Sequence, residues 1–157
     1  MEENHEMSTT ITGGCACGAI RYECTEEPVV SVHCQCRGCQ HFSGTGHMSL
    51  MVVPADAVTV AGAPKFYDSP ADSGGTTRRG FCPDCGSPVI GNSSGMADVV
   101  FLPAGSLDDP SLFDPTVAAY LLERPIRNPN IPQYNVNLRR LIAADNAARQ
   151  SGPGGTN

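Results

Sequence analysis

Alternating apolar and polar residues near the start of the chain predict β-strands interrupted by glycines. Within residues 11–25, Ile20, Tyr22 and Cys24 alternate with charged residues, the period of two that gives a strand one buried face. Further runs rich in β-branched residues predict strands at 29–33, 50–53, 58–61, 65–67, 99–104 and 116–122. A turn or mobile loop is expected over 68–77, where proline and glycines gather, and a turn with at most a short helical piece over 106–110.

The apolar pattern changes to a helical one near the end of the chain. Leu138, Leu141 and Ile142 lie at helical spacing and alanines follow them, which predicts an amphipathic helix over 135–150 that packs on the domain or extends it. Residues 1–10 are expected to form a flexible leader, and 151–157 a disordered tail, because neither segment holds the apolar residues that a core needs. The chain is therefore predicted to be one mainly β domain, residues 11–134, followed by a helix.

Composition and charge narrow the class of protein. The chain has 157 residues, 40% of them hydrophobic, and no run of eighteen apolar residues, so no membrane span is expected. Its formal net charge is −6 and its ten lysines and arginines are scattered, which argues against binding to nucleic acid or to an anionic membrane. The polar leader does not resemble a secretion signal, and this predicts a cytoplasmic protein.

Cysteine spacing gives the strongest chemical signal. Seven of the eight cysteines fall into three clusters, Cys15 with Cys17, then Cys34, Cys36 and Cys39, then Cys82 with Cys85. A cysteine-rich chain without a secretion signal is more readily metal-binding than disulfide-bonded. The remaining cysteine, Cys24, continues the alternation of a predicted strand and is expected to be a buried, inert thiol.

The first and third clusters are predicted to form one closed site. Cys82-Pro83-Asp84-Cys85-Gly86 has the pattern of a zinc knuckle, which supplies two of the four thiolates of a tetrahedral zinc. Cys15 and Cys17 are two residues apart, so an extended segment places both sulfurs on the same face. Pairing these four cysteines gives a structural zinc site that ties the first strand to the middle of the chain.

The middle cluster is left with three thiolates, the ligand number of a catalytic zinc with an open fourth position. The alternative is a fourth protein ligand: Cys24, His33, His41 or His47. His33 directly precedes Cys34, and a strand would point its ring away from that sulfur. His41 follows Cys39 by two residues and is a candidate proton shuttle or ligand. Arg37 and Arg79 are candidates for binding a substrate carboxylate, although exposed arginines are commonly just solvated.

These motifs resemble the family of glutathione-dependent formaldehyde-activating enzymes, which includes the centromere protein V type. The resemblance covers roughly residues 11–134 and rests on four segments: Gly13 to Tyr22, the middle cysteines followed by Ser43-Gly44, Arg79 to Pro88, and Gly105 to Pro110. It implies an Mss4-like fold of small β-sheets around a structural zinc, with a second zinc at the substrate cleft. The chain differs from the usual family pattern at Gln35, where histidine is common, and in having no tryptophan.

The resemblance also implies a reaction and its substrates. The expected function is that of a carbon–sulfur lyase or synthase, which joins glutathione or a similar thiol to a small carbonyl such as formaldehyde. Two zinc ions per chain are expected, the second held more weakly. The competing hypothesis is a non-catalytic zinc module that binds a protein partner or carries glutathione adducts. The sequence predicts nothing about the oligomeric state.

Overall fold

The fold comes from a computed structural model that describes residues 10–120 and 138–150. The predicted leader, the predicted tail and residues 121–137 lie outside these ranges. Two helices are described, α1 (Arg37–Ser43) and α2 (Leu138–Gln150). The described strands are β1 (Ile11–Gly14), β2 (Arg21–Cys24), β3 (Val30–Cys34), β4 (Met48–Pro54), β5 (Val58–Ala61), β6 (Lys65–Pro70), β7 (Thr76–Phe81), β8 (Pro88–Ser93), β9 (Val99–Pro103) and β10 (Val117–Ala119).

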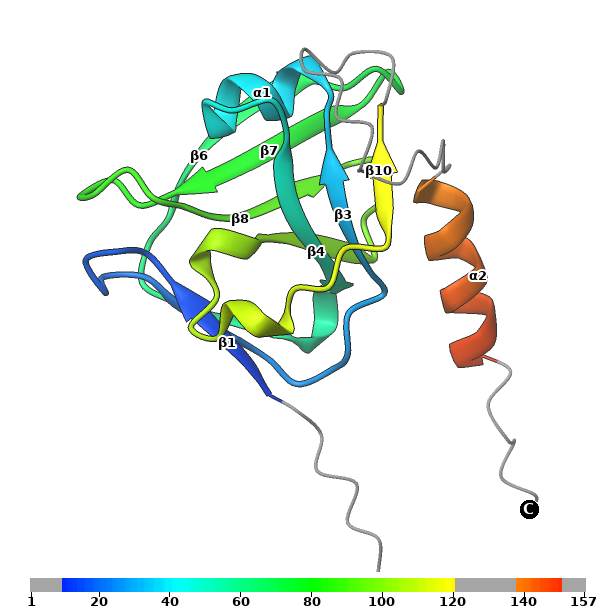
Figure 1. The fold of residues 1–157 in the computed structure, drawn as a ribbon, viewed down its shortest axis with the longest axis horizontal. Coiled ribbons are helices and arrows are strands. Elements are labelled where there is room, and N and C mark those ends of the chain that lie inside the picture. The colour runs from blue at the N-terminus through cyan, green and yellow to red at the C-terminus, as the bar shows by residue number, and fades with distance from the viewer. Residues whose placement is uncertain (1–9, 121–137, 151–157) are drawn as a thin grey trace, which may run out of the picture.

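The strands form two sheets (Figure 1). The smaller sheet has the order β1-β2-β5, and the larger has the order β10-β3-β4-β9-β8-β7-β6. Neighbouring strands are antiparallel, apart from β10, which runs parallel to β3. Short 3-10 turns lie at Ala55–Ala57, Ala104–Ser106 and Pro110–Leu112. The described residues are thus mainly β with one C-terminal helix, as the sequence predicts.

One apolar core joins the two sheets. Ile11, Tyr22 and Cys24 of the smaller sheet pack with residues of β4 and β9, and Cys24 has no exposed surface. Burying each large apolar side chain contributes about 1.5–3 kcal/mol. Burial raises the pKa of Tyr22 to about 12, and its hydroxyl is paired with the Ser106 hydroxyl at 2.7 Å. Cys24 therefore lies in the core, as predicted.

A second core lies between the larger sheet and α2. Val32, Leu50 and Val52 contact one another there, and Ile142 of α2 is 5% exposed among them. Cys34 and Cys39 belong to the same core. Ile142 of α2 therefore packs into the core of the larger sheet, and Cys34 and Cys39 of the middle cluster belong to the same core.

The structure differs from the sequence prediction in three places. The expected loop at 68–77 is a hairpin, because β6 runs to Pro70 and β7 begins at Thr76. β8 and helix α1 are not predicted by the pattern. α1 contains a glycine and few strong helix formers. Its contacts explain why it forms: Cys36 caps its first turn, Cys39 and Gln40 are buried, and the Gln40 amide donates to the Gln35 carbonyl at 2.6 Å.

None of the described helices combines the length and the apolar composition needed to cross a membrane.

Candidate metal centres

Four cysteines from two distant turns converge at one end of the molecule. Cys15 and Cys17 lie in the turn between β1 and β2, while Cys82 and Cys85 lie in the turn between β7 and β8. Their sulfur atoms all lie within 4.8 Å of one another. The Ala16 amide donates to the Ser87 hydroxyl at 3.1 Å, which connects the two turns directly. The predicted pairing of the first and third clusters agrees with this arrangement.

The sulfur spacing fits a tetrahedral cation. Sγ of Cys17 lies 3.5 Å from Sγ of Cys15 and 3.7 Å from Sγ of Cys82. A zinc–sulfur bond of about 2.3 Å places tetrahedral sulfurs about 3.8 Å apart. The Ile20 amide also donates to Sγ of Cys15 at 3.2 Å. The knuckle turn depends on Gly86, whose φ of 77° is a left-handed conformation that other residues adopt at a cost.

Ser87 belongs to this centre, although the spacing of the cysteines does not indicate it. Its hydroxyl lies 3.2 Å from Sγ of Cys85, and hydrogen bonds from its side chain and backbone lower the pKa of Cys85 to about 5. A thiol with a low pKa is readily a thiolate, the form that binds metal. The signal that could have pointed to Ser87 is its position two residues after the second knuckle cysteine.

The three cysteines of the middle cluster also converge. Cys34 ends β3, Cys36 is the N-cap of α1, and Cys39 lies in the first turn of α1. Their sulfur atoms lie within 4.8 Å of one another. The Cys39 amide donates to Sγ of Cys36 at 3.4 Å. Cys34 and Cys39 are buried and Cys36 is half-buried. A strand end and a helix start thus bring together sulfurs that the sequence places within six residues.

Crowding of the three sulfurs shifts their protonation in opposite directions. Hydrogen bonds from Cys34 and Cys39 hold the pKa of Cys36 well below its usual value, and the positive charge of Arg79 acts in the same direction. The contacts with Cys36 and Cys39 raise the pKa of Cys34. Cys36 is therefore the sulfur of this cluster that most readily exists as a thiolate.

The predicted alternatives for a fourth ligand lie elsewhere. Within residues 10–120 and 138–150, no further histidine, cysteine or carboxylate joins the three sulfurs. Cys24 lies in the core between the sheets. Nδ1 of His33 lies 3.0 Å from the Ser49 hydroxyl, and its ring meets that of His47 edge-on at 4.6 Å. Nε2 of His41 lies 3.2 Å from a guanidinium nitrogen of Arg37.

The two predicted arginines make different contacts around α1. Arg37 extends along the outer surface of the helix, where it contacts the Gln40 amide oxygen as well as His41. Arg79 comes from β7 and donates to the Ser69 hydroxyl at 2.7 Å. Its guanidinium also lies over the Phe42 ring, 5.9 Å from the ring centre. Both arginines are thus close to the middle cluster.

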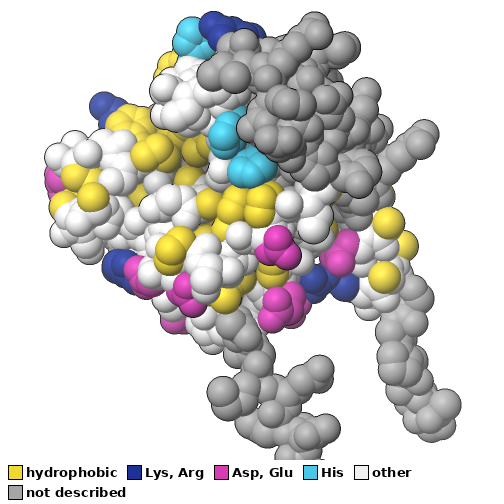
Figure 2. Space-filling model, in the orientation of Figure 1, with side chains coloured by type: hydrophobic (Ala, Val, Ile, Leu, Met, Phe, Trp, Pro, Cys, Tyr) yellow, Lys and Arg dark blue, Asp and Glu magenta, His cyan; other side chains and the backbone are white. Residues whose placement is uncertain are grey.

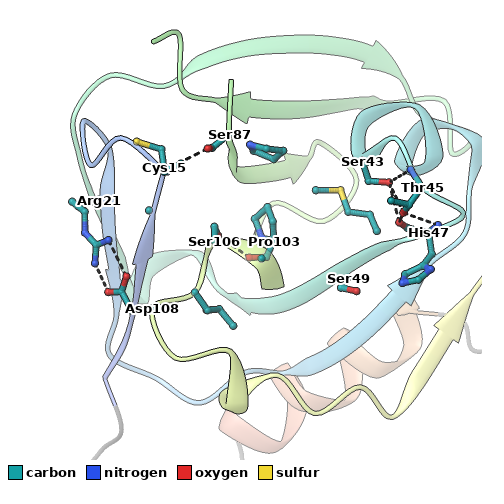
Figure 3. Close-up of a pocket in the computed structure, with 16 residues that line it drawn as sticks. Cys15, Arg21, Ser43, Thr45, His47, Ser49, Ser87, Pro103, Ser106 and Asp108 are labelled. Carbon is teal, nitrogen blue, oxygen red and sulfur yellow. Dashed lines mark hydrogen bonds and ion pairs between the residues drawn. The ribbon is translucent and has the colours of Figure 1, made fainter. Parts of the chain in front are cut away.

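The larger described cavity, about 640 Å³, does not contain the middle cluster (Figure 3). It lies between the turn that carries Cys15 and the segment from Ser43 to Ser49, and Arg21 and Asp108 line its outer edge. Its hydroxyl groups are mostly engaged within the protein, for example Ser43 with the His47 carbonyl at 2.9 Å. Histidines lie beside exposed apolar side chains on this face (Figure 2). A smaller hollow of about 320 Å³ is lined by Arg37, Gln40, His41 and residues 44–46.

An ion pair at the edge of the larger cavity predicts a pH dependence of stability. Asp108 accepts from Nη1 of Arg21 at 2.9 Å and from the Thr12 hydroxyl at 2.7 Å. The Arg21 guanidinium, together with Thr12, holds the pKa of Asp108 below its usual value. The stabilisation is therefore complete above the unfolded-state pKa of about 3.9, and it is lost as pH falls through the lower folded-state pKa.

Replacing Asp108 with asparagine should therefore lower the melting temperature at neutral pH by an amount that shrinks below about pH 4. Thermal melts of both proteins over a pH series measure this, at pH values where each keeps its metal. Arg21→Gln should show the same pH dependence, because it removes the other half of the pair. A difference that stays constant down to low pH would contradict the role given to the Asp108 carboxylate.

Comparison with known proteins adds a family and a fold. Residues 10–123 match the family model described as glutathione-dependent formaldehyde-activating enzyme. No curated protein matches the chain. Among solved structures, a crystal structure of a Rhodobacter sphaeroides protein is similar with a TM-score of 0.54 and 17% sequence identity, over 68% of this chain and 98% of that chain. At this identity the likeness concerns the fold alone.

Proposed function

Because the chain belongs to the glutathione-dependent formaldehyde-activating enzyme family, we propose that it joins a small thiol to a small carbonyl at the middle cysteine cluster. The thiol is glutathione or a close analogue, the carbonyl is formaldehyde or a similar aldehyde, and the reverse reaction makes the protein a carbon–sulfur lyase. The observation that carries the proposal is the convergence of Cys34, Cys36 and Cys39, which no other ligand-type side chain among the described residues joins.

The four-cysteine site and the middle cluster take different roles in this proposal. Cys15, Cys17, Cys82 and Cys85 hold a structural zinc, because four thiolates complete its coordination. Cys34, Cys36 and Cys39 hold a second zinc more weakly. When bound there, zinc supplies a Lewis acid that keeps an incoming thiol ionised beside its electrophile. The fit is supported by sulfur atoms within 4.8 Å of one another in each cluster.

The reaction forms one bond between the two substrates. A lone pair of the thiolate sulfur forms the carbon–sulfur bond, the π pair of the carbonyl moves to its oxygen, and the proton lost by the thiol ends on that oxygen. Holding both reactants in one site contributes through proximity. Formaldehyde and glutathione also combine in water, so the protein accelerates a reaction that its substrates already undergo.

Side chains of α1 serve the substrates rather than the metal. Arg37 pairs with a carboxylate of the thiol substrate, which is supported by its position at the smaller hollow. His41 is the candidate that moves the proton. An arginine only donates hydrogen bonds, so Nε2 of His41 is the acceptor in its contact with Arg37.

We also propose that residues 11–134 form the catalytic unit and that the helix of residues 135–150 packs onto it. Burial of Ile142 beside residues of the middle cluster supports this arrangement. The protein is proposed to act in the cytoplasm.

Kinetics with substoichiometric protein test the proposed function. Glutathione, cysteine and 2-mercaptoethanol are each mixed with formaldehyde, acetaldehyde or glyoxal, and free thiol is followed over time. We expect the protein to speed the approach to equilibrium for at least one pair without moving the end point, as a catalyst must. A carrier would instead withdraw thiol in proportion to its own concentration. No effect on any pair would contradict the enzyme and favour a binding module.

A further inference from the structure

The guanidinium of Arg79 is held against the first turn of α1. Its Nη1 donates to the Ser69 hydroxyl at 2.7 Å, and its plane lies over the Phe42 ring. Ser69 belongs to β6 and Phe42 to α1, so the hairpin and the helix both fix the cation. A guanidinium with partners on two elements loses less freedom than a solvated one when it serves a neighbouring charge.

Gly38 makes room for this cation between two of the clustered cysteines. A Cβ atom built on Gly38 would lie 2.5 Å from Nη2 of Arg79 and 3.3 Å from its Cζ. Real Cβ atoms do not approach other atoms so closely, and any larger residue would push the guanidinium away. Alanine ordinarily stabilises a helix relative to glycine by about 0.5–1 kcal/mol. The present position of the Arg79 guanidinium therefore depends on the absence of a side chain at Gly38.

The contact between Arg79 and α1 affects the charge around the middle cluster. A divalent cation with three thiolates has a net charge of −1, and binding of a further thiolate makes this charge −2. A cation beside the cluster reduces the repulsion that the incoming anion meets. We propose that Arg79 is a positioning residue of the middle cluster, which offsets the negative charge of its three thiolates and so favours binding of an anionic thiolate there. This inference rests on the proposed function of the cluster.

The neighbouring arginine provides a matched control. Arg78 is on the same strand, but its side chain points to the opposite face of the sheet. There it pairs with Asp68 at 3.1 Å and lies over the Phe66 ring at 4.7 Å. Arg78 is exposed, whereas Arg79 is half-buried. Replacing either arginine with glutamine removes one positive charge from β7. Only the Arg79 variant removes a charge that lies beside α1.

Thiol titrations of the cobalt-loaded full chain test the proposal. Cobalt(II) replaces zinc and its visible spectrum reports a new ligand, while the four-cysteine site, already complete, should not respond. Glutathione and 2-mercaptoethanol are used in parallel because only glutathione carries carboxylates. We expect Arg79→Gln to weaken the binding of both thiols by about tenfold, which is the effect of one partly screened charge at close range. Arg78→Gln should bind both thiols as the wild type does.

Two further variants keep the test decisive if Arg79→Gln loses cobalt. Arg79→Lys retains the charge but not the planar group, and should bind both thiols more tightly than Arg79→Gln does. Gly38→Ala displaces the guanidinium without removing it, and should weaken both thiols severalfold. Strong weakening in Arg79→Lys, together with normal binding in Gly38→Ala, would overturn the proposal.

The two thiols separate the competing explanations. If Arg79→Gln weakens the binding of glutathione but not that of 2-mercaptoethanol, Arg79 binds a substrate carboxylate and the charge-offset role is wrong. If neither thiol weakens, Arg79 is a structural residue only. If the wild type itself binds neither thiol, both the proposed function and this inference are contradicted. A loss shared by both thiols in Arg79→Gln, and absent from Arg78→Gln, supports the proposal.

Discussion

Replacing Cys82 with alanine should abolish the cooperative unfolding transition of the domain. Cys82 has no exposed surface, and its sulfur lies 3.7 Å from that of Cys17, 65 positions away in the chain. The apolar cluster around it is small: among the described residues, Ile20 and Val89 are buried beside Cys15 and Cys82, and Val60 and Ile90 pack against them. Structural zinc sites in small domains contribute about 10–16 kcal/mol, which matches or exceeds the total stability of about 5–15 kcal/mol for a typical domain.

The measurements are the thermal melt and the metal content of the purified chain. Cys24→Ala is the matched control, because Cys24 is equally buried but lies in the core between the sheets. Removing that sulfur leaves a small cavity and should cost about 1 kcal/mol with a cooperative melt retained. A strong chelator should unfold the wild type in the same way as the Cys82 variant. A normal melt for Cys82→Ala would refute the structural role of the four-cysteine site.

Replacing Cys36 with serine should remove function and one metal ion while leaving the fold intact. The Cys36 sulfur accepts a hydrogen bond from the Cys39 amide as the N-cap of α1. Serine is a favoured N-cap residue, so the helix start is retained. A serine hydroxyl does not ionise near neutral pH and is a poor zinc ligand. We expect the thiol–carbonyl rate to fall at least about 100-fold, beyond the effect of a lost outer-shell contact.

Cys36→Ala separates the two roles of this residue. It should lose the second metal as the serine variant does, and it should also lose about 1 kcal/mol of stability with the cap. Circular dichroism, metal analysis and the rate of thiol loss together measure these effects. If Cys36→Ser kept two metal ions and its full rate, the middle cluster would not be the reacting site. The contrast between this variant and Cys82→Ala tests the division of labour between the clusters.

The sequence predicted the strands and the cysteine groupings well because both depend on short-range pattern. Alternation of Ile20, Tyr22 and Cys24 gave β2 and its buried face, and Leu138 with Ile142 gave α2. The C-x-x-C knuckle constrains its sulfurs through a turn of a few residues, so its metal-binding geometry is local. Its pairing with Cys15 and Cys17 followed from ligand number, since a closed zinc needs four ligands.

Helix α1 and the surroundings of the middle cluster depend on contacts between distant residues. The helix has seven residues and a glycine near its start, and helices this short are unstable alone. Its burial against the larger sheet and its cap at Cys36 make it form. The predicted loop at 68–77 became a hairpin for a related reason, because backbone pairing between β6 and β7 outweighed the local turn signals.

The sequence by itself determined which cysteines form short metal-binding motifs and the family that the chain resembles. It could not decide which side chains surround the sulfurs. Arg78 and Arg79 are adjacent in the chain, yet strand pleating sends them to opposite faces, and only the folded hairpin places Arg79 against Gly38. The spacing within each cysteine motif is a property of a segment a few residues long. The charge around a site is set by side chains that only tertiary packing brings together.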